Sequence, residues 1–239
     1  MSCVTPADLG KPIAAIVERC GAPESVTSSA GESSLRYRLD GHGVEVVFDA
    51  DQMRARVLQF FTASEQSQSA PAWTLALPFE SGMHDIALGT TTLAEAQSAL
   101  AVDADVTTQY GEAYRSKSHN DVVLAFDGQH VARAAFVGER MALVQSGVIA
   151  RPLDAAPLEL TSPVPRGEVL NTARTGPQAA IFRIDVDATG IVRNVTVVVP
   201  SGDDAFDAST QQRLGDLKFH PATLDKRPIP GTCFVQVRH

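Results

Sequence analysis

The sequence predicts an α+β protein: two helix-plus-antiparallel-sheet units at residues 7–62 and 71–150, a proline-rich linker at 151–175, and a small C-terminal domain at 176–239. Apolar residues with helical spacing occur in short runs, whereas the apolar–polar alternation of half-buried strands recurs along the chain. The two leading units also repeat one order of elements. Because short turns join the predicted strands, the sheets are expected to be antiparallel.

The first unit begins with a short helix and continues through strands. Its helical stripe consists of Ile13, Ile16, Val17 and Cys20. The run Gly21-Ala22-Pro23 is a stop signal for that helix. Strands separated by turn residues are expected at residues 34–39, 44–48 and 54–61.

The second unit repeats this order of elements. Its helical stripe consists of Leu93, Ala96, Ala99 and Leu100. This stripe follows Leu88-Gly89 as the first stripe follows Leu9-Gly10, and strands are expected at residues 122–126 and 131–137. The nearly constant interval between matching features indicates a duplication. The alternative is that two unrelated α+β units share a common order of elements.

Two polar segments separate the predicted regions. Residues 62–70 are rich in Ser and Gln, and residues 151–175 carry several prolines without sustained periodicity. The second segment is expected to form an extended linker with polyproline character.

The C-terminal domain is predicted to open with a strand pair. Alternation with polar residues marks the apolar positions Phe182, Ile184 and Val186 of the first strand. Turn chemistry at residues 187–190 then leads to a second strand at residues 191–199.

A helix and a closing strand complete the domain. Asp207 is expected to cap the helix, whose buried face carries Thr210, Leu214 and Leu217. Apolar residues alternate again at residues 232–238, which form the predicted closing strand.

Several spaced features of residues 176–239 resemble the C-terminal domains of TonB and TolA. They are Ser201-Gly202, Asp207, Phe219-His220-Pro221-Ala222 and the turn at residues 225–228. The resemblance implies β-augmentation, in which a partner's extended peptide joins a sheet edge. It also implies a buried Phe219 and makes residues 232–238 the candidate edge.

The leading units resemble two groups of small non-catalytic modules. The order of Leu9-Gly10, helix, Gly21-Ala22-Pro23 and strands resembles the outer-membrane assembly lipoprotein BamE and the tandem halves of the β-lactamase inhibitory protein. The second unit departs from the pattern, with Ala101-Val102-Asp103 at the stop. The resemblance implies a sheet face or loops presented to another protein.

The overall charge bears on the class of partner. The 239-residue chain has a net charge of −8, which argues against sequence-independent binding to nucleic acid. The charge suits a protein partner with a basic face, although a requirement for solubility alone is the simpler explanation. No window of about 18 apolar residues occurs, so no membrane-spanning helix is expected.

The N-terminus and the cysteines bear on the compartment. No basic start or apolar stretch predicts a signal peptide, so the chain as written is expected in the cytoplasm; the alternative is a trimmed periplasmic protein. TonB itself carries an N-terminal membrane anchor. In the trimmed alternative, Cys3 is a candidate lipoprotein cysteine. Three cysteines do not predict a disulfide framework, and Cys20 and Cys233 are expected to be small buried residues.

The candidate motifs for catalysis and metal binding lack the surrounding residues and elements that those functions need. Asp185, Asp187 and Thr189 match the nucleophile loop of haloacid-dehalogenase-type phosphatases, but too little chain follows to build the parallel sheet that this chemistry needs. The same segment fails as a calcium loop because Thr196 stands where Glu is required. The six histidines lack ligand spacing, and no phosphate loop occurs. We therefore expect no enzyme activity, metal or cofactor.

Two surfaces are candidates for binding another protein. The edge-strand candidates are Thr232, Phe234, Gln236 and Arg238, and a basic stripe is expected from Arg36, Arg38, Arg54 and Arg56. The favoured function is a non-catalytic, protein-binding protein of bacterial type, related to TonB and the cell envelope. The alternatives are a soluble inhibitor or immunity protein that neutralises a toxin or enzyme, and an enzyme with an unrecognised motif.

Overall fold

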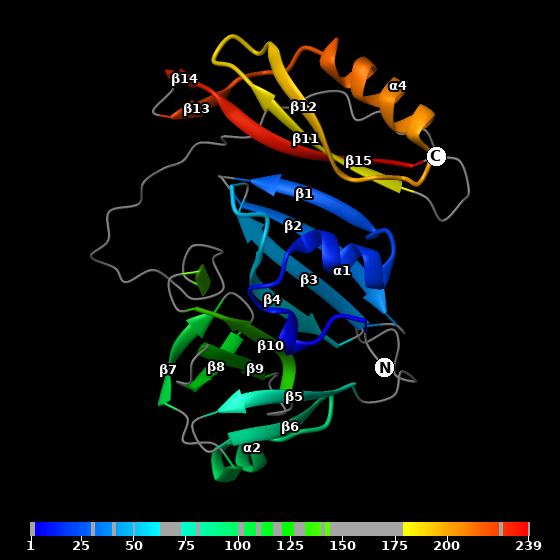
Figure 1. Ribbon diagram of the computed structural model, residues 1–239. Helices are drawn as coiled ribbons and strands as arrows, with labels where there is room; N and C mark the ends of the chain where they lie inside the picture. Colours follow the sequence, from blue (N-terminus) through cyan, green and yellow to red (C-terminus); the bar gives the residue numbers. More distant parts are fainter. Residues whose placement is uncertain are drawn as a thin grey trace. The chain divides into compact units, whose positions relative to one another are not determined.

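The computed structural model describes residues 3–29, 32–39, 42–49, 51–62, 73–79, 82–99, 103–108, 111–116, 121–126, 132–139, 142–143, 179–224 and 227–238 (Figure 1). The chain forms two compact units. One comprises Met1–Lys11, Arg36–Val47 and Arg54–Ala156, and the other comprises Pro12–Leu35, Phe48–Met53 and Pro157–His239. These units cross the predicted boundaries, since the predicted unit at residues 7–62 contributes to both. Whether the predicted domains fold independently stays a prediction.

In the residues that the structure describes, the leading part of the chain consists mainly of strands, with short helices between some of them. In order, the elements are η1 (Pro6–Asp8), α1 (Ile13–Cys20), β1 (Ser25–Ser29), β2 (Glu32–Leu39), β3 (His42–Asp49), β4 (Ala55–Phe61), β5 (Trp73–Phe79), β6 (Gly82–Leu88), α2 (Leu93–Ala99), β7 (Asp103–Thr108), β8 (Gly111–Ser116), β9 (Asp121–Phe126) and β10 (Ala132–Gly138). Most of these strands belong to one eight-stranded sheet, ordered β1-β2-β3-β4-β10-β9-β8-β7, and β5 and β6 form a separate hairpin.

The strands predicted for the two leading units therefore share a sheet. Antiparallel pairing of β4 with β10, from Val57↔Gly138 to Phe61↔Ala134, joins the two four-stranded groups. Pairing the last strands satisfies N–H and C=O groups that two separate sheets would leave at an edge. The α+β class with antiparallel sheets agrees with the prediction, whereas separate sheets do not.

Matching glycines recur before the two short helices. Gly10 has φ 77° and donates its N–H to the carbonyl oxygen of Ala55 at 2.8 Å; Gly89 has φ 91° and donates to Ala132 at 2.7 Å. The two acceptors are the first residues of β4 and β10. Glycine readily adopts positive φ, so both helices can be approached by the same backbone turn. This repeated geometry supports the duplication inferred from the sequence.

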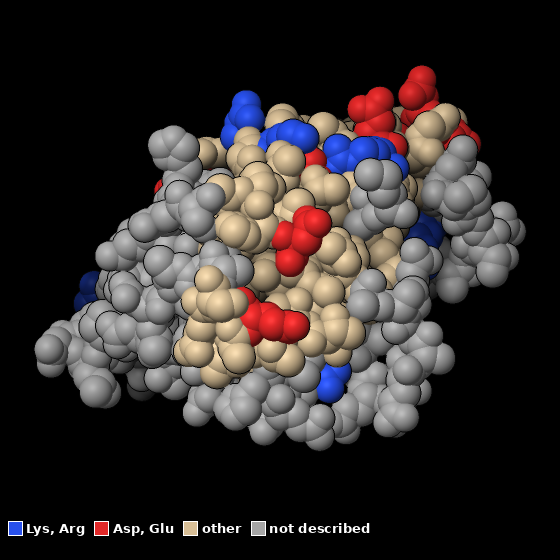
Figure 2. All heavy atoms as spheres, turned by 90° about the horizontal axis from the view of Figure 1, so that it is seen from below, with Lys and Arg blue, Asp and Glu red and all other residues tan. Residues whose placement is uncertain are grey.

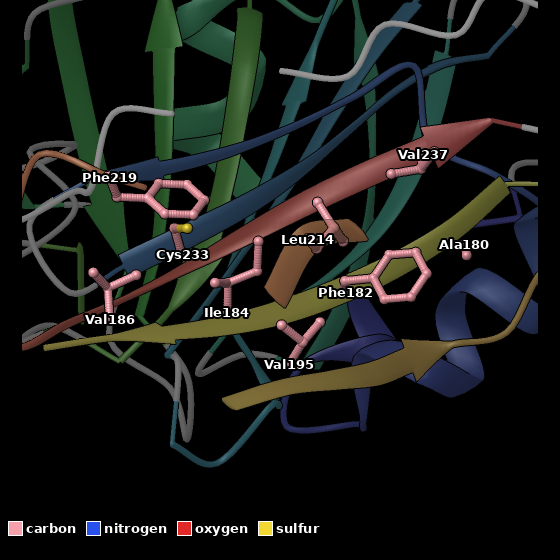
Figure 3. Close-up of a cluster of buried hydrophobic side chains, with 9 residues drawn as sticks. All are labelled: Ala180, Phe182, Ile184, Val186, Val195, Leu214, Phe219, Cys233 and Val237. Atoms are coloured by element: carbon pink, nitrogen blue, oxygen red, sulfur yellow. The ribbon is translucent and has the colours of Figure 1, made fainter. Parts of the chain in front are cut away.

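The C-terminal part forms a small sheet with one helix. Its elements are β11 (Ala179–Val186), β12 (Val192–Val199), α4 (Asp204–Gly215), β13 (Ala222–Leu224), β14 (Arg227–Ile229) and β15 (Gly231–Arg238). The three-stranded sheet has the order β12-β11-β15, and β13 pairs with β14. Alternate side chains of β11 and β15 point towards α4, where they enclose a hydrophobic core (Figure 3). The predicted core residue Phe219 is buried in this cluster, which confirms its expected role.

The start of α4 corrects one prediction. Asp203, not Asp207, is the N-cap: its carboxylate accepts from the N–H groups of Ala205 at 2.9 Å and Phe206 at 3.0 Å. Asp207 lies within the helix, is buried, and accepts from the N–H of Ser201 at 3.0 Å. Both carboxylates precede the apolar stripe, but only Asp203 has the extended backbone of an N-cap.

The cysteines correct another prediction. Cys3 and Cys20 are disulfide-bonded, whereas Cys20 was expected to be a small buried thiol. A disulfide also leaves Cys3 without a thiol for a lipid, which removes the lipoprotein role for this residue. Cys233 is free and buried, as predicted. Among the described residues, no helix is long and apolar enough to cross a membrane.

Candidate partner-binding edge

β15 is an outer strand of the three-stranded sheet. It pairs antiparallel with β11 along its whole length, from Gly231↔Val186 to Arg238↔Ala179. The strand order β12-β11-β15 gives β15 no further strand partner among the described residues. The predicted edge, residues 232–238, therefore lies at a sheet edge.

The side chains of β15 serve both faces of the sheet. Cys233 and Val237 join the core beneath α4. Phe234 points to the opposite face, is 5% exposed, and meets Phe48 edge-to-face with ring centroids 5.2 Å apart. Phe234, predicted to contact a partner, is thus an interior residue of its own unit.

The polar side chains of β15 are also engaged within the unit. Thr232 donates its hydroxyl to Asp185 at 2.8 Å. Gln236 donates to the carbonyl oxygen of Pro23 at 2.9 Å, and Arg238 donates to the carbonyl oxygens of Pro23 at 3.3 Å and Glu24 at 3.2 Å. β1 of the same unit also lies close to β15, so any further recognition through this strand would rest mainly on its backbone.

Two titratable groups beside β15 have shifted pKa values. Burial, aided by the nearby charge of Asp185, raises the pKa of Cys233 to about 12, so this thiol stays protonated and is a poor nucleophile. Burial raises the pKa of Asp185, but hydrogen bonds from Thr232, Arg183 and Asn194 outweigh it, and the net pKa is lowered. A stably ionised carboxylate and a protonated thiol do not form an acid–base or nucleophilic pair.

Asp187 closes the turn between β11 and β12. Its carboxylate accepts from the hydroxyl of Thr189 at 2.6 Å, from the N–H of Ile191 at 3.0 Å, and from Arg193 at 2.8 Å. These bonds, that of Thr189 first, hold the pKa of Asp187 well below its usual range. These partners lie in the turn or at the start of the strand that follows it, which favours the turn interpretation over a phosphatase loop. Within the described ranges, no group of three or more potential metal ligands occurs.

The four arginines of the expected basic stripe lie on or beside two strands. Arg36 and Arg38 belong to β2, Arg56 belongs to β4, and Arg54 directly precedes β4. β3 stands between the two strands in the sheet. Arg54 donates to the carbonyl oxygen of Gly10 at 2.9 Å. Figure 2 shows one face of the molecule, where uncharged side chains cover most of the described surface and separate acidic side chains lie in its middle. The four arginines belong to one compact unit and the β15 residues to the other.

Sequence comparison finds that the C-terminal sheet is similar to a known family. Residues 179–238 match the family described as the Gram-negative bacterial TonB protein C-terminal. The C-terminal domain is TonB-like. The match begins and ends with the strands β11 and β15, so the candidate edge belongs to the TonB-like domain. No match supports the resemblance of the leading units to BamE or to the β-lactamase inhibitory protein, which stays a prediction.

Two solved structures show a remote similarity to about two thirds of the chain. One is a cysteine-rich secretory protein from Staphylococcus aureus, with 11% identity, a TM-score of 0.37, and coverage of 64% of this chain and 56% of that chain. The other is an extracellular protein containing an SCP domain from Bacillus anthracis, with 12% identity, a TM-score of 0.37, and coverage of 65% and 53%. The chain thus spans about half the length of each, and TM-scores this low do not establish a common fold. No curated protein matches the chain.

Proposed function

We propose that the chain is a non-catalytic protein-binding protein whose TonB-like domain takes an extended segment of a partner onto the outer edge of β15. The observation that carries this proposal is the position of β15, a terminal strand within the family match. An outer strand presents N–H and C=O groups as a template for a further strand. Because the β15 side chains are engaged within the unit, recognition runs mainly through the backbone.

We place this function in the periplasm of a bacterium. The disulfide-bonded state of Cys3 and Cys20 supports this location, because disulfides form and persist in oxidising compartments and are rare in the cytosol. Thiol counting on protein taken from the native cell tests the location. We expect no reactive thiol in the folded protein, one after unfolding, and three after unfolding with a reductant. Three thiols after unfolding without a reductant would instead indicate a cytoplasmic protein.

Two neighbouring proline substitutions test the edge. N–H groups of successive strand residues point to alternate sides, so Val235→Pro and Gln236→Pro remove one N–H that faces β11 and one that faces outward. The variant that removes the N–H facing β11 should lower the melting temperature markedly, because it breaks a hydrogen bond of the sheet. The variant that removes the N–H facing outward should leave the melting temperature nearly unchanged and abolish partner binding.

Partner binding is followed by photo-crosslinking of the full chain in the native bacterium. A photoreactive residue at Pro230, which is exposed and directly precedes β15, should form an adduct. The matched control carries the same group at Arg213, an exposed residue of α4. Adduct formation that survives both proline substitutions would sink the proposal, and it would favour an inhibitor that binds through its leading sheet.

A further inference from the structure

The opposite edge of the TonB-like sheet borders a groove. Val192–Val195, the first half of β12, form one wall of a cavity of about 420 Å³. The other wall is formed by α4 residues Ala208, Gln211, Gln212 and Gly215, whose spacing places them on one face of the helix. The groove therefore runs between a terminal strand and a helix.

The chain itself pairs with the outer side of this strand at one end. Lys218 forms an antiparallel bridge with Ile191, and the N–H of Phe219 donates to the carbonyl oxygen of Gly190 at 2.9 Å. β11 holds the other side, where the N–H of Asp187 donates to Ile191 at 2.9 Å. A short piece of extended backbone thus already lies along the outer edge, just before the groove begins.

A side-chain amide occupies an acceptor further along the edge. Gln211 donates to the carbonyl oxygen of Val195 at 2.6 Å, which is the bond that the backbone N–H of an added strand would make. The helix wall beside it is open: Ala208 is small and exposed, and a Cβ added at Gly215 would meet nothing within 4 Å. An added strand has room to replace the Gln211 amide.

The side chains that line the groove favour binding of a peptide main chain over binding of a charged group. Arg193 is already paired with Asp187, with the two side chains 2.6 Å apart. The remaining wall side chains are amides, aliphatic groups and a glycine. Amides donate and accept hydrogen bonds without a net charge, so they suit the main chain of an extended peptide.

We propose that this β12–α4 groove binds an extended, uncharged segment of a partner protein, which continues the strand pairing begun by Lys218 and takes the Val195 carbonyl from Gln211. The site lies on the opposite edge from β15, so the proposal goes beyond the function proposed above. A chain with two such edges would join two extended segments through one small sheet.

The test uses the full chain and a phage-displayed library of random linear peptides. Enriched peptides are titrated into labelled protein, and backbone amide NMR signals are recorded. We expect peptides without charged residues that shift the signals of Val192–Val195 and of the α4 wall. Their affinity should change little with salt, because no ion pair forms. Enriched peptides that shift only β15 signals, or no enrichment at all, would overturn the proposal.

Matched substitutions on α4 separate the groove from the rest of the surface. Ala208→Trp fills the groove and should weaken peptide binding by about tenfold or more, whereas Ser209→Trp, on an exposed neighbouring position outside the groove, should not. Gly215→Leu provides a second block if Ala208→Trp lowers the melting temperature. Equal affinity of the blocked chains and the Ser209→Trp control would also overturn the proposal.

Discussion

The two outer strands of the TonB-like sheet are held in different ways. β15 buries side chains on both faces, with Cys233 and Val237 beneath α4 and Phe234 against Phe48. Within β12, only Val195 is buried, and the other side chains are exposed or half-buried. β15 is thus buried on both faces of the sheet, whereas β12 has a single fully buried side chain.

This difference separates two kinds of binding template. A strand fixed on both faces keeps its outer backbone in one conformation, so an added segment pays little to order it. A strand held on one face can adjust, but it leaves a polar acceptor that must be satisfied, as Gln211 does for Val195. We therefore expect β15 to be the more rigid template and β12 the more adaptable one.

The largest expected loss of stability comes from replacing the buried side chains of the two outer strands. Phe234→Ala should lower the free energy of unfolding by about 3–5 kcal/mol, because it leaves a cavity against Phe48. Val195→Ala, its counterpart on β12, should cost about 2 kcal/mol, because it removes two methyl groups from a single core. Urea unfolding of both variants checks the ranking. Equal costs would show that β15 is not fixed on both faces.

A glycine pair sharpens the picture of the β12 edge. Gly190 has φ 86°, and a Cβ there would lie 2.0 Å from the carbonyl oxygen of Phe219. Gly190→Ala should therefore cost at least about 2 kcal/mol and disrupt the pairing of Lys218 with Ile191. Gly215→Ala is the matched control: its Cβ has open space, so a gain of up to about 1 kcal/mol is expected. Thermal melting distinguishes the two, and a tolerated Gly190→Ala would contradict the close approach.

The sequence predicted those elements of the C-terminal domain whose pattern is local. Alternation of Phe182, Ile184 and Val186 marked β11, and Gly190 marked its turn. The start of β11 was missed, because Ala179, Ala180 and Ile181 are all buried and show no alternation. A strand covered on both faces loses the period-two signal on which its prediction depends.

The site could be predicted only in part, because its surroundings come from distant residues. The position of β15 at an edge followed from the resemblance to TonB. That Gln236 and Arg238 bind Pro23, and that Phe234 meets Phe48, depends on residues that lie far earlier in the chain. No local pattern records such contacts, and the disulfide-bonded state of Cys3 and Cys20 was missed for the same reason.

The smallest expected effect distinguishes the carboxylates that serve the two edges. Asp185 accepts from Thr232 of β15, whereas Asp187 accepts from Ile191 and Arg193 at the start of β12. Both pKa values are lowered in the folded chain, that of Asp187 more strongly. A lowered pKa adds stability above the unfolded value of about 3.9, and this stability is lost as the pH falls below it.

Asp187→Asn should therefore reduce the fall in melting temperature at acid pH more than Asp185→Asn does. Neither carboxylate is deeply buried, so solvent screening keeps both effects small. The melting temperature of the parent and of both variants is recorded from neutral pH into the acid range, and the difference from the parent isolates each carboxylate from the others. If both variants ran parallel to the parent at every pH, the two bonded carboxylates would not stabilise their edges. A larger effect from Asp185→Asn would instead make the β15 edge the one that depends more on charge.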